Sequence, residues 1–123
     1  MKSKWIIHKG TRVLYANLSD FKTNSQAFKV EMDAVVEMVS QMPPNSVLGL
    51  LDVRGTVLST QVSEVLRGGA SELKSYIHKR AIVATQITGF KKIIVSGIGR
   101  FVGRAPRLFD DVEKAKDWLV SNK

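Results

Sequence analysis

The side chains that most often carry chemistry in proteins are few in this sequence. It contains two histidines, His8 and His78, and no cysteine. No carboxylate stands at a spacing from either histidine that would complete a metal-binding motif. Without cysteine there is neither a thiolate ligand nor a cysteine nucleophile. The sequence therefore predicts no metal site and no cofactor.

One carboxylate, Asp52, stands where α/β proteins often place a functional one. It ends a short and almost uninterrupted apolar run over residues 46–53, which is typical of a strand buried on both faces of a sheet. Open α/β sheets bind ligands at the carboxyl ends of such strands. The same aspartate is well placed to hold the following turn at Arg54 and Gly55. Asp52 is therefore either a structural residue or, if the chain is an enzyme, its first catalytic candidate.

A glycine-containing stretch over residues 97–103 superficially matches a nucleotide-binding loop. Its third glycine comes one residue too late for a dinucleotide-binding fingerprint, and the Lys-Ser or Lys-Thr of a phosphate-binding loop is missing. The glycines do permit close approach of the backbone to another helix, chain or ligand. We expect an adaptable segment here rather than a nucleotide site.

Positive charge is concentrated in one third of the chain, whose formal net charge is +8. Between positions 74 and 107 there is no acidic residue, and the eight basic ones are Lys74, Lys79, Arg80, Lys91, Lys92, Arg100, Arg104 and Arg107. The other 11 basic residues are balanced by the 11 acidic ones. Such an asymmetry indicates an anionic partner, which could be anionic lipid, nucleic acid or an acidic protein surface.

Hydrophobic periodicity places these residues on alternating strands and helices. Strands are expected over residues 5–8, 12–18, 46–53, 81–86 and 107–109. Helices are expected over residues 28–42, 60–77 and 88–104, and after Asp110 or Asp111. The order β-β-α-β-α-β-α-β-α predicts an α/β fold in which an antiparallel hairpin opens a mixed sheet of about five strands, covered by four helices.

Length and composition favour a single domain over residues 1–123. A chain of this size, with 44% hydrophobic residues, can bury one core without disulfides. The N-terminus becomes charged too early for a signal peptide, and no apolar run approaches the roughly 20 residues of a membrane-spanning helix. Together with the lack of cysteine, these features predict a soluble cytoplasmic protein.

Several stretches resemble the SpoIIAA-like fold, which is shared by STAS domains and by the lipid-binding lobe of Sec14-type (CRAL-TRIO) proteins. The similarity is closer still to SpoIIAA-like single-domain proteins of bacteria that have no assigned function. The matching residues are 43–48 (PPNSVL), 51–55 (LDVRG), 103–104 (GR), 108–111 (LFDD), Glu113, Ala115, Trp118 and Leu119. The resemblance covers nearly the whole chain and implies a scaffold rather than a particular activity.

STAS regulators carry a phosphorylatable hydroxyl in an Asp-Ser-Ser-Gly stretch between the third strand and the second helix. Its place is taken here by Leu58, Ser59, Thr60 and Gln61, which keep two hydroxyls but neither the aspartate nor the glycine. The resemblance implies a phospho-switch on Ser59 or Thr60, at a helix start that favours negative charge. The alternative is that the hydroxyl simply caps the helix.

The leading interpretation is a non-enzymatic regulatory or binding module that acts on a protein or on lipid or another anionic surface. Besides Asp52, its candidate binding residues are Phe90, Lys91, Lys92, Ile94, Ile98, Arg100, Phe101 and Arg104. The apolar residues among them also predict a homodimer. Nucleic-acid binding is an alternative without an aromatic stacking pair to support it, and an enzyme that uses Asp52 in a cleft is another.

Overall fold

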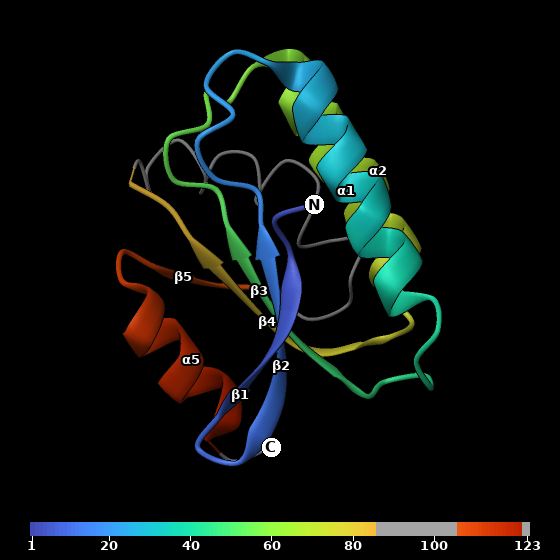
Figure 1. Ribbon diagram of the computed structural model, residues 1–123, viewed down its shortest axis with the longest axis vertical. Helices are drawn as coiled ribbons and strands as arrows, with labels where there is room; N and C mark the ends of the chain where they lie inside the picture. The colour runs from blue at the N-terminus through green and yellow to red at the C-terminus, as the bar shows by residue number, and fades with distance from the viewer. Residues whose placement is uncertain (86–105, 122–123) are drawn as a thin grey trace.

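The computed structural model describes residues 1–85 and 106–121 of the chain (Figure 1). They form a five-stranded sheet with three helices. In chain order the elements are β1 (Lys4–His8), β2 (Thr11–Asn17), α1 (Ser25–Val39), β3 (Val47–Asp52), α2 (Thr60–Leu73), β4 (Ile77–Val83), β5 (Arg107–Phe109) and α5 (Val112–Val120). The α/β class expected from the sequence is confirmed. The helix expected over residues 88–104 lies outside the described residues.

The sheet has the strand order β1-β2-β3-β4-β5. β1 and β2 pair antiparallel, and the remaining neighbours pair parallel, which makes the sheet mixed. The hairpin turns at Lys9 and Gly10, whose φ angles of 50° and 78° are those of a tight two-residue turn. Because β2 to β5 are parallel, their carboxyl ends meet at the same edge of the sheet.

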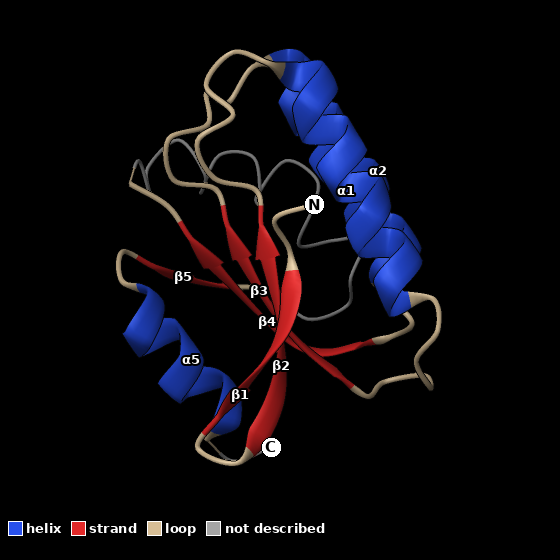
Figure 2. Cartoon of the chain, in the orientation of Figure 1, coloured by secondary structure: helices blue, strands red, loops and turns tan. Residues whose placement is uncertain are grey.

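Helices cover both faces of the sheet (Figure 2). α1 and α2 lie on one face, where Phe28, Met32 and Leu66 join the core, and α5 lies on the other, where Ala115 and Leu119 are buried. All six residues of β3 are buried, as an apolar strand between two helical layers should be. Among the described helices, none has the length and apolar content needed to cross a membrane.

The boundary between α2 and β4 differs from the sequence expectation. α2 ends at Leu73 instead of continuing to Ile77, and β4 begins at Ile77 instead of at residue 81. The backbone carbonyl of Tyr76 accepts hydrogen bonds from the amides of Ser46 and Val47. These bonds join the segment before Ile77 to the start of β3, so Ile77 enters the core from a strand although its spacing fits a helix.

Each of the three described helices begins after a polar residue whose side chain accepts a hydrogen bond from a backbone amide. The N-cap residues are Asn24 for α1, Ser59 for α2 and Asp111 for α5. Such a cap stabilises a helix by about 1 kcal/mol because it satisfies an amide that has no partner inside the helix. The helix starts expected at Asn24 or Ser25 and at Asp110 or Asp111 are therefore confirmed.

Candidate functional site

Asp52, at the carboxyl end of β3, is fully buried and surrounded by hydrogen-bond donors. Arg54 donates to it from Nε at 2.9 Å and from Nη2 at 2.7 Å, and its backbone amide donates at 3.2 Å. The Tyr15 hydroxyl donates to Oδ2 at 2.7 Å. Asp52 therefore ties down the turn that follows β3, as its structural interpretation predicts.

The electrostatics of Asp52 follow from these bonds. Burial alone would raise the pKa of its carboxyl group, but the bonds from Arg54 and Tyr15 together lower that pKa below its usual value. Burial and the bond to Asp52 raise the pKa of Tyr15 to about 12. A fully bonded carboxylate with a lowered pKa is a weak base, and its oxygens are not free to reach a substrate. This geometry gives no support to the enzyme alternative.

The two hydroxyls at the start of α2 have different environments. Ser59 is the N-cap, and its Oγ accepts from the amide of Val62 at 3.1 Å. Thr60, the first residue of the helix, is exposed. A phosphate on Ser59 would have to replace the capping bond, whereas Thr60 is open to a kinase. The phospho-switch remains a prediction, with Thr60 the more accessible of its two candidates.

Part of the basic third of the chain is used inside the fold. Lys79 Nζ donates to the carbonyls of Trp118 at 2.7 Å and Ser121 at 2.8 Å, which closes the C-terminal end of α5. Arg107 lies over the Trp118 ring at 5.8 Å, and Arg80 is buried. Three of the four described members thus make contacts inside the fold. Arg107 is nevertheless exposed, and so is Lys74 at the end of α2.

The remaining candidate binding residues lie outside the described residues. They are Phe90, Lys91, Lys92, Ile94, Ile98, Arg100, Phe101 and Arg104. Their role on a binding surface, and the homodimer expected from the apolar ones, stay predictions. Among the residues that are described, no group of three histidine, cysteine or acidic side chains could hold a metal ion.

The β1–β2 hairpin carries a second basic segment, which sequence reasoning did not single out. No acidic residue precedes Asp20 in the sequence, and Lys4, Lys9 and Arg12 are all exposed. Ile7 stands beside them with 71% of its surface exposed. The sequence signal for this surface is the absence of acidic residues before Asp20. This signal is hidden when the charges of all residues outside positions 74–107 are summed, because that sum is zero.

The strand pairing places an aromatic and an apolar side chain on the same side of this hairpin as a guanidinium. Trp5 pairs with Leu14 and Ile7 pairs with Arg12, so these side chains share one face of the sheet. The guanidinium of Arg12 lies over the Trp5 ring, 4.3 Å from its centroid. We call Trp5, Ile7 and Arg12, which share this face, the hairpin surface.

The opposite side of the hairpin is fixed to α5. Asp117 accepts from His8 Nε2 at 2.7 Å and pairs with Lys9 Nζ at 3.0 Å. Hydrogen bonds from His8 and Lys9 lower the pKa of Asp117. His8 therefore has a structural partner, and part of the charge of Lys9 is offset.

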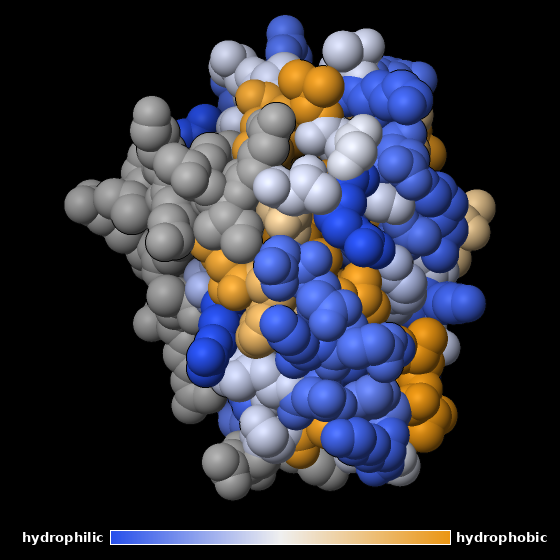
Figure 3. Space-filling view, turned by 90° about the vertical axis from the view of Figure 1, so that its left-hand side faces the viewer, coloured by the Kyte–Doolittle hydropathy of each residue, from blue (hydrophilic) through white to orange (hydrophobic). Residues whose placement is uncertain are grey.

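The surface around α5 is different in character from the hairpin surface. In Figure 3, hydrophilic side chains dominate the lower part of the view, where α5 lies, and apolar residues form separate small groups. This helix carries two acidic and two basic residues, which are Glu113, Lys114, Lys116 and Asp117. The side of α5 that faces solvent is thus a mixed, hydrated surface.

Comparisons with known proteins do not place this chain in a family. No family model matches it, and no curated protein or solved structure is similar to it. The resemblance to SpoIIAA-like proteins therefore rests on the sequence motifs alone.

Proposed function

We propose that this chain is a non-enzymatic binding module that attaches to anionic membrane surfaces through the hairpin surface. One observation carries the proposal: Ile7 is 71% exposed on the same face as Trp5 and Arg12, in a segment without acidic residues. Tryptophan is enriched at membrane interfaces, and an apolar side chain beside basic ones can enter the headgroup region while the cations meet lipid phosphates.

The two kinds of contact contribute differently to such binding. Each basic residue near an anionic membrane contributes about 1 kcal/mol, and this part weakens as salt is added. Burial of an isoleucine side chain contributes roughly 1.5–3 kcal/mol if it is complete, and this part does not depend on salt. Arg12 supplies the first kind of contact and Ile7 supplies the second, so the hairpin surface should leave a salt-resistant component of binding.

The state of Asp52 supports the non-enzymatic part of the proposal. A catalytic carboxylate that acts as an acid or base usually has a raised pKa and reaches its substrate from a cleft. Asp52 has a lowered pKa, and Arg54 and Tyr15 occupy its oxygens.

Sedimentation with phosphatidylserine vesicles, from about 50 to about 200 mM salt, tests the proposal. We expect the wild-type chain to keep part of its affinity at high salt, and Ile7→Thr, which retains a strand-compatible side chain, to lose that part. Arg12→Glu should lower the affinity mainly at low salt. Val30→Thr is the matched control, because Val30 is also an exposed apolar residue but lies on α1.

Three results separate the alternatives. Equal binding of the Ile7→Thr variant and wild type at high salt would contradict the role of the hairpin surface. Binding to duplex DNA that disappears between the same salt limits, with no vesicle binding, would favour nucleic acid instead. Loss of vesicle binding only in a Lys91→Glu/Lys92→Glu variant would move the site to residues 88–104.

A further inference from the structure

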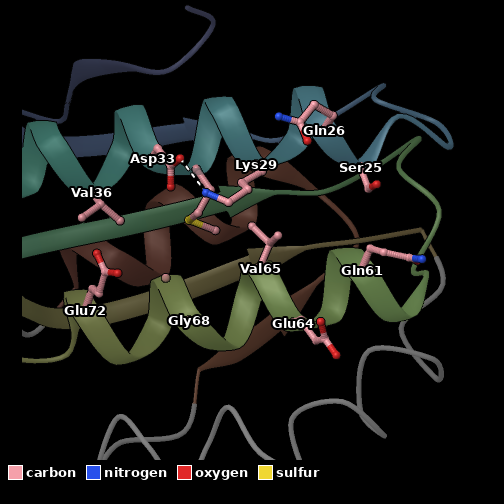
Figure 4. Close-up of a pocket in the computed structure, with 12 residues that line it drawn as sticks. Ser25, Gln26, Lys29, Asp33, Val36, Gln61, Glu64, Val65, Gly68 and Glu72 are labelled. Carbon is pink, nitrogen blue, oxygen red and sulfur yellow. Dashed lines mark hydrogen bonds and ion pairs between the residues drawn. The ribbon is translucent and has the colours of Figure 1, made fainter.

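A groove of about 460 Å³ runs between α1 and α2 on the side of these helices that faces away from the sheet (Figure 4). Its apolar lining comes from both helices, with Met32 and Val36 from α1 and Val65 from α2. The two helices contact each other beneath it. A groove between two neighbouring helices is the shape into which a third helix packs.

Two adjacent glycines of α2 shape this groove in different ways. A Cβ on Gly69 would lie 2.6 Å from Met32 Sδ, so a larger residue there would force the Met32 side chain, which packs between α1 and α2, to move. A Cβ on Gly68 would meet nothing within 4 Å. Glycine weakens a helix relative to alanine, and no described residue packs at Gly68 closely enough to explain the absence of a side chain there. The space above Gly68 therefore fits the approach of an external backbone.

The groove is acidic although the chain as a whole is strongly basic. Glu64, Gly68 and Glu72 follow one another at intervals of four residues along α2, so two carboxylates flank the open glycine (Figure 4). Across the groove, Asp33 binds the ammonium group of Lys29 at 2.9 Å. Both glutamates are exposed and make no ion pair with a described residue. The lining thus carries three carboxylates against one ammonium group.

We infer that the groove between α1 and α2 docks an amphipathic helix of a partner protein, with the helix's apolar face against Met32, Val36 and Val65 and basic side chains toward Glu64 and Glu72. Glu64 and Glu72 are about 12 Å apart along α2, since a helix rises 1.5 Å per residue. Lysines or arginines seven or eight positions apart on the partner helix match that spacing. The inference is independent of the membrane proposal, because the groove and the hairpin surface share no residue.

Fluorescence anisotropy with a labelled helical peptide of about 18 residues tests the inference. The probe carries a leucine stripe flanked by lysines seven positions apart, and two control peptides carry glutamates in place of the lysines or the same residues in scrambled order. We expect the chain to bind the basic amphipathic peptide at least tenfold more tightly than either control. Raising the salt should weaken this binding several-fold because the carboxylates contribute to it.

Variants of the chain then locate the site. Gly68→Leu should weaken binding at least tenfold, because the new side chain fills the groove and also favours the helix, so that folding is retained. Glu64→Gln/Glu72→Gln should weaken binding several-fold and reduce its salt dependence. The matched controls are Ser71→Leu on α2 and Glu37→Gln on α1, which change exposed positions outside the groove lining and should leave the affinity unchanged.

Three outcomes would overturn the inference. The first is that the basic peptide does not bind or binds no better than its controls. The second is that Gly68→Leu binds the peptide as wild type does while its circular dichroism spectrum shows a folded chain. The third is that the wild-type chain dimerises in light scattering and Gly68→Leu is monomeric, because the groove would then be occupied by a second copy.

Discussion

Two buried charges of opposite sign lie on neighbouring strands, and only one of them has hydrogen-bond partners among the described residues. Asp52 at the end of β3 is fully buried, and Arg80 within β4 is 6% exposed. Asp52 accepts from the side chains of Arg54 and Tyr15. The three guanidinium nitrogens of Arg80 find no hydrogen-bond partner within residues 1–85 and 106–121. Two charged side chains of similar burial therefore differ in whether hydrogen bonds compensate for the cost of removing their charge from water.

The shifts in pKa express the same contrast. Desolvation lowers the pKa of Arg80 to about 10, because the interior destabilises a cation that no described residue neutralises. At Asp52 desolvation acts in the opposite sense on the pKa, and the donors around the carboxylate outweigh it. Hydrogen bonds, rather than burial itself, therefore decide whether a buried charge stabilises this fold.

Removal of the bonded charge should have the largest effect on stability. Asp52→Ala leaves the hydroxyl of Tyr15 and the amide of Arg54 without their acceptor, and we expect the free energy of unfolding to fall by about 3 kcal/mol. Urea unfolding followed by circular dichroism measures it. Asp33→Ala is the control, because its exposed pair with Lys29 should contribute about 0.5 kcal/mol or less. Equal losses in the two variants would contradict the comparison.

Asp52→Ala also gives a prediction for the stability of the chain at acidic pH. A carboxyl group whose pKa is lower in the folded than in the unfolded chain contributes stability above its unfolded value, here 3.8, and loses it as the pH falls through the folded value. The wild-type chain should therefore lose stability below about pH 4 more steeply than Asp52→Ala. Urea midpoints at a series of pH values between about 2 and 6 would show the difference, and parallel curves would exclude it.

Replacement of the unpartnered charge should act in the opposite direction. Arg80→Met keeps a long side chain and removes a buried cation, so we expect the free energy of unfolding to rise by about 2 kcal/mol. Thermal and urea unfolding both measure this change. Lys74→Met, at an exposed position after α2, should change stability by no more than about 0.5 kcal/mol. A destabilised Arg80→Met variant would mean that the guanidinium is paired in solution.

Much of the fold could be predicted from the sequence because its determinants are local. The apolar run that became β3, the helical spacing of α1 and α2, and the capping residues all act over a few positions. β4 was harder to predict because Ile77 fits the helical spacing of the segment before it and because Lys79 and Arg80 follow. Buried arginine is rare, so the expected start of the strand moved to residue 81.

The candidate sites depend on contacts between distant residues. The turn formed by Asp52 and Arg54 was foreseeable from their spacing, but Tyr15, the other partner, lies on β2 and comes next to Asp52 only through strand pairing. The groove likewise forms only when α1 and α2 pack together, whereas the hairpin surface is built within residues 5–12 of one local hairpin. Patterns in one sequence identify individual helices and strands well. A site that forms between distant helices or strands can be recognised only once the fold shows which of them are neighbours.

The smallest effect is expected from the most conservative change at the bonded charge, Tyr15→Phe. It removes one of the donors to Asp52 and leaves the aromatic packing, so the free energy of unfolding should fall by about 1 kcal/mol.

Because the pKa of Tyr15 is raised to about 12 in the folded chain, the stability from this phenol is present below its unfolded pKa of 10.0 and is lost as the pH rises toward 12. An alkaline titration of the absorbance near 295 nm should show a phenol that ionises at about pH 12 in the wild type and is missing in Tyr15→Phe. In Asp52→Ala the same phenol should ionise at lower pH, since the carboxylate that opposes its ionisation is gone. If Tyr15 ionised at its ordinary pH in the folded wild-type chain, the bond between Tyr15 and Asp52 would be absent in solution, and Arg54 alone would hold the buried carboxylate.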